Sequence, residues 1–181
     1  AKGAPESLSD PERRARAESV QAVVGNFERA IAAPDVTEAL GWTPSELGLE
    51  CVDFLRSVGS RAAALNRLDS LFRREAFGPE GAPARAIRTF SELVLEAVDA
   101  TAVGADRERV LRAGDELLAL LTSEDWEATE DAAGRLGDLQ ALASLVQRAD
   151  DPTRCAPALA FLTGQLRGDD EAALERRAQL G

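Results

Sequence analysis

Apolar residues recur at helical spacing near the start of the chain, and this period constrains the fold more than any other feature. The residues concerned are Val20, Val23, Val24, Phe27 and Ile31. The segment 9–12, Ser-Asp-Pro-Glu, is typical of a capped helix start, and Pro34 ends the pattern, so we predict a helix over residues 11–33. Ala and Leu dominate the apolar residues and only 4% of all residues are aromatic, which favours helix along the whole chain.

Similar start and stop signals divide the rest of the chain into further helices. We predict helices at 36–40, 44–58 and after Ser60, one from Ile87 to Gly104, and one marked by 110–121. In this prediction Ser123 caps a further helix that runs through Leu136, and Asp138 caps the next. Another opens at Asp151, where Pro157 either kinks the helix or resets its start, and Asp169 or Asp170 caps the last. The sequence thus predicts an all-α fold, an irregular multi-helix bundle or a short solenoid-like array of about nine or ten helices. The loop at 77–83, FGPEGAP, separates either two subdomains, 1–78 and 79–181, or two parts of one continuous domain.

The run LGWTPSEL at residues 40–47 specifies a helix junction in unusual detail. Gly41 ends the helix before it, and Pro44 suits the first position of the helix after it. Thr43 and Glu46 have the spacing of a capping box, and Trp42 can pack on Leu47 as a hydrophobic staple. Every position therefore has a local structural role.

Acidic charge is concentrated in the second half of the chain. Residues 1–90 carry 13 acidic and 12 basic residues, whereas residues 91–181 carry 19 and 9, within a net charge of −11. Such a surface repels nucleic acids and anionic membranes and suits a partner with a basic or mixed surface. The candidate partner-binding residues are the two tryptophans and one acidic run: Trp42, Trp126, Glu124, Asp125, Glu127, Glu130 and Asp131.

Residues 35–58 offer an alternative, because a short helix, a Gly-containing turn and a capped second helix resemble the helix-turn-helix of bacterial transcription regulators. The resemblance implies that the second helix enters the major groove of DNA. Candidate nucleic-acid contacts are Thr43, Ser45, Arg56, Arg61, Arg67 and Arg74. Glu46, Glu50 and Asp53 lie on that helix and have the wrong charge to face phosphate, so DNA binding ranks second.

The chain has little of the usual chemistry of active sites. It contains no His, which excludes His-based catalysis and His metal ligands within the chain, and its two Cys residues are far apart. We assign no catalytic, cofactor or metal residue, and a carboxylate-based enzyme or small-molecule binder ranks third. The leading hypothesis is a non-enzymatic protein-interaction, adaptor or regulatory domain.

The compartment is inferred from equally few signals. No apolar run approaches the roughly 18 residues of a membrane span, and the two separated cysteines fit free cytosolic thiols, so we expect a cytoplasmic protein. The chain begins at Ala1 and contains no Met, so we also expect that an initiator, a targeting segment or a tag was removed. The sequence does not indicate the oligomeric state.

Overall fold

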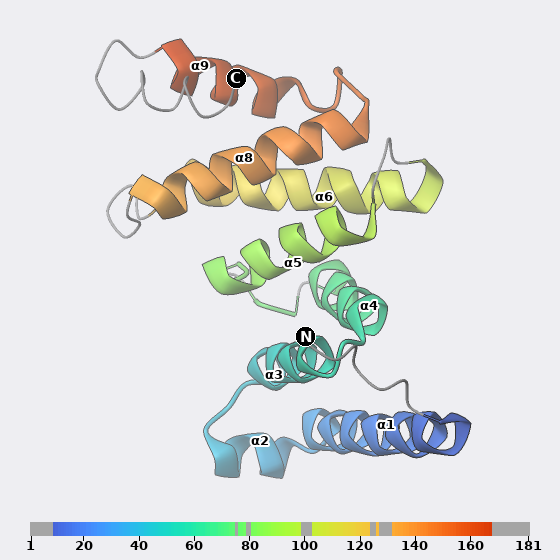
Figure 1. The fold of residues 1–181 in the computed structure, drawn as a ribbon. Coiled ribbons are helices and arrows are strands. Elements are labelled where there is room, and N and C mark those ends of the chain that lie inside the picture. Colours follow the sequence, from blue (N-terminus) through green and yellow to red (C-terminus); the bar gives the residue numbers. More distant parts are fainter. Residues whose placement is uncertain are drawn as a thin grey trace. The chain divides into compact units, whose positions relative to one another are not determined.

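Helices make up the computed structural model, which describes residues 9–74, 76–78, 81–98, 103–123, 126 and 132–167. Within these residues there are eight helices and no strand, which confirms the all-α class; the predicted nine or ten helices slightly exceed this number (Figure 1). The helices are α1 (Asp10–Ala32), α2 (Pro34–Leu40), α3 (Pro44–Ser57), α4 (Arg61–Arg73), α5 (Ala84–Ala97), α6 (Gly104–Leu121), α8 (Ala132–Ala149) and α9 (Ala156–Arg167). The helix predicted from Asp169 or Asp170 lies outside the described residues.

Contacts between helices divide the chain into two compact units, Ala1–Ala76 and Phe77–Gly181. The first unit contains α1 to α4, and the second contains α5, α6, α8 and α9. None of the helices described has both the length and the apolar character that a membrane span requires.

The core of the first unit lies between α3 and α4. Its buried apolar side chains are Leu47, Leu49, Cys51, Val52 and Leu55 from α3, and Ala64, Leu65, Leu68, Leu71 and Phe72 from α4. Gly48 allows α3 to approach α4 closely, because a Cβ atom at this position would lie 3.0 Å from both methyl carbons of Leu71. The close approach buries apolar surface from both helices and thereby stabilises the pair.

Helix α1 packs against α3 and α2 with a half-buried apolar stripe, and none of its side chains is fully buried. Its contacts with the rest of the first unit include the rings of Phe27 and Phe54, with centroids 6.3 Å apart, and the Arg16 guanidinium, which donates to the Val58 carbonyl at 3.0 Å. Arg67 of α4 also forms an ion pair with Glu28 at 3.3 Å. Helix α1 therefore lies at the edge of the first core rather than within it.

In the second unit, α6 packs against both α5 and α8, and α9 packs against α8 and α6. The largest fully buried side chains here are Phe90, Leu93 and Val94 of α5, Val110 and Leu117 of α6, and Leu139, Leu142 and Leu145 of α8. These apolar residues follow the helical spacing predicted from the sequence.

Two predicted helix boundaries in the second unit are wrong. The chain does not break at Gly137-Asp138, because α8 runs through both residues, and the Asp138 side chain bonds to Arg88 and Trp126 rather than capping a helix. Gly104 does not end the helix that contains Ile87; α5 ends at Ala97, and Gly104 is the first residue of α6. Its φ of 55° lies in the left-handed region that glycine tolerates, so it turns the chain into α6.

Candidate interaction surface

The junction between α2 and α3 is fixed by the local bonds that the sequence predicts. Gly41 has a φ of 65°, and its N–H donates to the carbonyl of Glu38 at 3.1 Å, which closes α2. The Thr43 Oγ1 atom accepts from the backbone N–H of Glu46 at 3.2 Å, and the Glu46 carboxylate accepts from the Thr43 N–H at 2.6 Å. This capping box confirms the predicted helix start. The backbone and hydroxyl hydrogen bonds from Thr43 hold the pKa of Glu46 below its ordinary value.

Two large apolar side chains remain exposed at this junction. Leu40, the last residue of α2, is 54% exposed, and Trp42 is 43% exposed. The predicted staple partner of Trp42, Leu47, is buried in the core of the first unit. The capped turn therefore presents an indole ring and a leucine side chain to solvent on a backbone of defined geometry.

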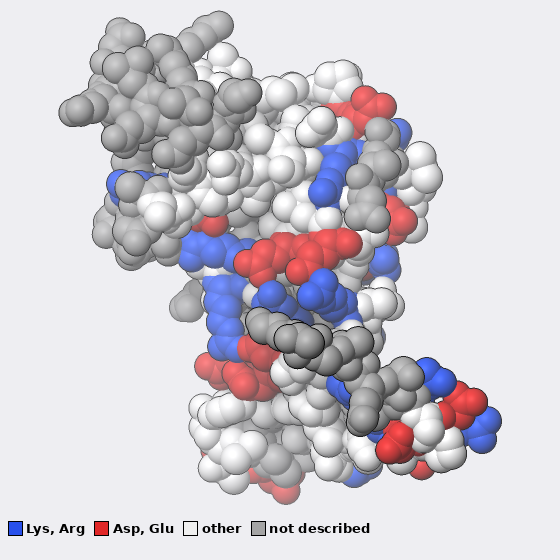
Figure 2. Space-filling model, viewed as in Figure 1, with Lys and Arg blue, Asp and Glu red and all other residues white. Residues whose placement is uncertain are grey.

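The charged residues in the sequence around this turn are all acidic. No Lys or Arg stands between Arg29 and Arg56, whereas Asp35, Glu38, Glu46, Glu50 and Asp53 all lie in this stretch. The first three of these carboxylates are exposed, and the other two are half-buried. In Figure 2 the described atoms over α2, at the lower left, are mostly uncharged, with acidic atoms at the edge. We call residues 35–46 the acidic turn.

The candidate DNA contacts on the first unit have other partners or positions. Thr43 is the capping residue, and Ser45 Oγ lies 3.0 Å from its hydroxyl. Arg67 pairs with Glu28 of α1 at 3.3 Å. Arg56 is half-buried, while Arg61 and Arg74 are exposed. The predicted recognition helix, α3, buries most of its apolar surface against the first unit and keeps Glu46 exposed, so its free side carries acid where a base-reading helix needs donors.

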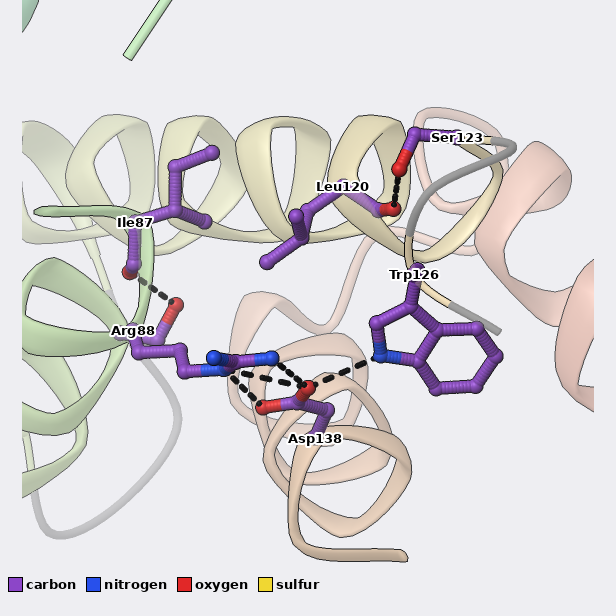
Figure 3. Close-up of polar contacts among 7 residues, drawn as sticks. Ile87, Arg88, Leu120, Ser123, Trp126 and Asp138 are labelled. Atoms are coloured by element: carbon purple, nitrogen blue, oxygen red, sulfur yellow. Dashed lines mark hydrogen bonds and ion pairs between the residues drawn. The ribbon is translucent and has the colours of Figure 1, made fainter. Parts of the chain in front are cut away.

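The second tryptophan is a core residue. Trp126 is only 3% exposed, and its indole Nε1–H donates to Asp138 Oδ2 at 3.0 Å (Figure 3). Arg88 of α5 binds the same carboxylate through two nitrogens: Nε donates to Oδ1 at 3.0 Å, and Nη2 donates to Oδ2 at 2.9 Å. A side chain so deeply buried offers almost no area to a partner. The acidic residues predicted beside it, Glu124, Asp125, Glu127, Glu130 and Asp131, lie outside the described residues.

Sequence reasoning did not identify two of these residues. Asp138 looked like a helix cap, and nothing local indicates that its partner is Arg88, 50 positions away in the sequence. For Leu40 the sequence predicts only the end of a short helix, because five helical residues are too few to define an apolar face.

A small pocket lies between α6, α8 and α9 in the second unit. It encloses about 20 Å³, which is room for a water-sized group, and Asp115, Arg154 and Cys155 are among its lining residues. Burial raises the pKa of the Cys155 thiol, and the carboxylates of Asp151 and Asp115 raise it further. A thiol held protonated in this way is a weak nucleophile at neutral pH. Among the described residues no cluster of His, Cys, Asp and Glu has the arrangement of a metal site.

The geometry therefore singles out the acidic turn of the first unit, where the apolar side chains of Leu40 and Trp42 are exposed in a stretch that carries acidic residues. Comparisons with protein-family models, with curated proteins and with solved structures found no match to this chain.

Proposed function

We propose that this chain is a non-enzymatic protein-interaction domain with an adaptor or regulatory role, and that its partner docks on the acidic turn between α2 and α3. The observation that carries the proposal is the pair of exposed anchors, Leu40 and Trp42, on a turn whose backbone is held by a capping box. Tryptophan is among the residues that contribute most to protein interfaces.

The size of the apolar contribution supports binding of moderate strength. Full burial of a leucine side chain contributes about 1.5–3 kcal/mol, and roughly half of Leu40 remains to be covered. Trp42 adds a larger rigid surface at little cost in side-chain entropy. Because Gly41 and the Thr43 cap already hold the turn, docking requires little ordering of the backbone.

Affinity capture with matched variants tests this function. The wild-type chain, a Leu40→Ser/Trp42→Ser variant and a Val103→Ser/Leu159→Ser control are used as baits in the same extract. The control removes exposed apolar residues from the second unit and leaves the acidic turn intact. We expect a protein that wild type and control both retain and that the Leu40/Trp42 variant loses. Equal retention by all three baits would refute the proposal.

DNA binding through residues 35–58 is the second candidate, favoured by the succession of α2, the tight Gly41 turn and the capped α3. It predicts duplex affinity that falls steeply with salt and is lost in an Arg61→Glu/Arg74→Glu variant. Absence of salt-dependent binding to random duplex DNA would remove this candidate. A carboxylate-based enzyme or small-molecule binder ranks third, and it predicts a ligand that raises the thermal midpoint of unfolding in a concentration-dependent way.

Two broader features complete the proposal. The successive packing of α5, α6, α8 and α9 supports a short solenoid-like arrangement of the second unit, which would suit an interaction domain. A cytoplasmic location is supported by two buried free cysteines in a chain without a disulfide framework.

A further inference from the structure

We infer that the partner of the acidic turn is a basic amphipathic protein segment, in which an apolar anchor is flanked by Lys or Arg. The inference rests on the proposed function and adds the chemical class of the partner. It is carried by the position of Leu40 and Trp42 within a stretch that holds carboxylates and no basic residue.

The charged residues of the acidic turn itself are all acidic. Asp35 and Glu38 are exposed on α2, and Glu46 is exposed in the first turn of α3. The nearest basic residues along the chain are Arg29 and Arg56, on either side of the turn. A segment with Lys or Arg beside its apolar anchor gains favourable charge contacts there, and long-range attraction raises its association rate.

Other classes of partner fit this surface less well. Nucleic acids and anionic membranes would bring phosphates against carboxylates, and these like charges repel one another unless salt screens them. A purely apolar segment would cover Leu40 and Trp42 and would leave the surrounding carboxylates without a counter-charge. A basic amphipathic segment satisfies both the exposed apolar side chains and the acidic rim.

Three synthetic peptides test the inference. Each has about 18 residues with Leu at helical spacing on one face, and the opposite face carries Lys, Gln or Glu. Binding is measured by calorimetry with the full chain, at salt concentrations of about 0.05 M and about 0.5 M, which span Debye lengths of roughly 14 Å to 4 Å. We expect the Lys peptide to bind tightest, to weaken with salt and to lose about tenfold or more in affinity against Trp42→Ala.

Charge variants show which carboxylates contribute to binding of the Lys peptide. An Asp35→Asn/Glu38→Gln variant, checked for helix content by circular dichroism, is expected to lose about tenfold in affinity for the Lys peptide at the lower salt concentration. A Glu92→Gln/Asp106→Asn control makes the same change in net charge on α5 and α6 of the second unit and should retain nearly wild-type affinity. This control separates the acidic turn from the general negative charge of the chain.

The outcomes distinguish the inference from the function on which it rests. Equal binding of the Lys and Gln peptides, with both lost in Trp42→Ala, would overturn the basic partner and leave the docking surface in place. Binding of the Lys peptide that is unchanged by Trp42→Ala, or reduced equally by the control variant, would overturn the inference. Failure of the Lys peptide to bind at either salt concentration would also overturn it, while the capture experiment decides the proposed function separately.

Discussion

Replacing Asp138 with Ala is expected to destabilise the second unit by about 2–4 kcal/mol. The substitution removes the acceptor of the Trp126 indole N–H and the ion-pair partner of Arg88 together. An unsatisfied buried donor costs about 1–3 kcal/mol. Removing one partner of a fully buried ion pair costs about 3–5 kcal/mol, and the cost here is lower because the Arg88 side chain is 29% exposed and regains water.

The variant Asp138→Asn separates the two contributions. Asparagine keeps a carbonyl oxygen that can accept from Trp126 but removes the charge, so we expect a smaller loss of about 1–2 kcal/mol. In an Arg88→Met background the same Asp138→Ala substitution should cost less than it does in wild type, because the ion pair is already absent.

Urea unfolding followed by the fluorescence of Trp126 measures these losses. A Trp42→Phe background makes Trp126 the only tryptophan, so the signal comes from the second unit alone. A lower urea concentration at the unfolding midpoint, with an unchanged dependence of the unfolding free energy on urea concentration, reports the loss of stability. A loss below about 0.5 kcal/mol for Asp138→Ala, or equal losses for Ala and Asn, would show that the bonds at Asp138 do not stabilise the unit as argued.

Three further predictions concern local packing, capping and the thiols. Gly48→Ala should lower the stability of the first unit by about 1–3 kcal/mol, because the added methyl group overpacks the contact with Leu71. Gly114→Ala should be neutral or stabilising by up to about 1 kcal/mol, because its added methyl group meets no atom within 4 Å. Urea unfolding of both variants tests whether the two changes in stability differ in this way. Thr43→Ala should cost about 1 kcal/mol of stability at neutral pH. Hydrogen bonds from Thr43 lower the pKa of Glu46 in the folded state. The stabilisation that Glu46 gives to the fold is therefore present above its unfolded pKa and is lost as the pH falls through its folded pKa. If the urea midpoint depended on pH in the same way in wild type and in Glu46→Gln, this reasoning would be contradicted. Both cysteine thiols should react with a maleimide far more slowly in the native chain than in urea, since Cys51 is fully buried and burial raises the pKa of its thiol. Mass spectrometry counts the maleimide adducts. Rapid labelling of the native chain would contradict the burial of the thiols.

Local signals explain the parts of the fold that the sequence predicted correctly. The capped start at Ser9 and the capping box at Thr43 each depend on a residue three positions further on, and both form: the Ser9 N–H donates to the Glu12 carboxylate at 2.8 Å. The apolar spacing predicted near the start of the chain likewise matches the half-buried stripe of α1, which includes Val20, Val23 and Phe27. Information of this kind lies within one or two helical turns of each residue.

Long-range contacts explain the errors. Gly137-Asp138 has the composition of a helix break, but Arg88 and Trp126 bind the Asp138 carboxylate where it projects from α8. The exposure of Trp42 and the burial of Trp126 could not be distinguished either, because each stands near a predicted helix start: Trp42 just before the Thr43 cap and Trp126 three residues after the Ser123 cap. Which tryptophan reaches solvent depends on the packing of whole units, which no short stretch of sequence records.

The peripheral position of α1 has a consequence for the order in which the first unit folds. Helices α3 and α4 are joined by a short connection and contain all the fully buried side chains of this unit among the described residues, so they can assemble at a low entropic cost of loop closure. Helix α1 has no fully buried side chain, and we expect it to dock on a preformed α3–α4 hairpin and to open first on unfolding. Faster native-state hydrogen exchange along α1 than along α3 would record that order, and equal protection of both helices would argue for a single cooperative step.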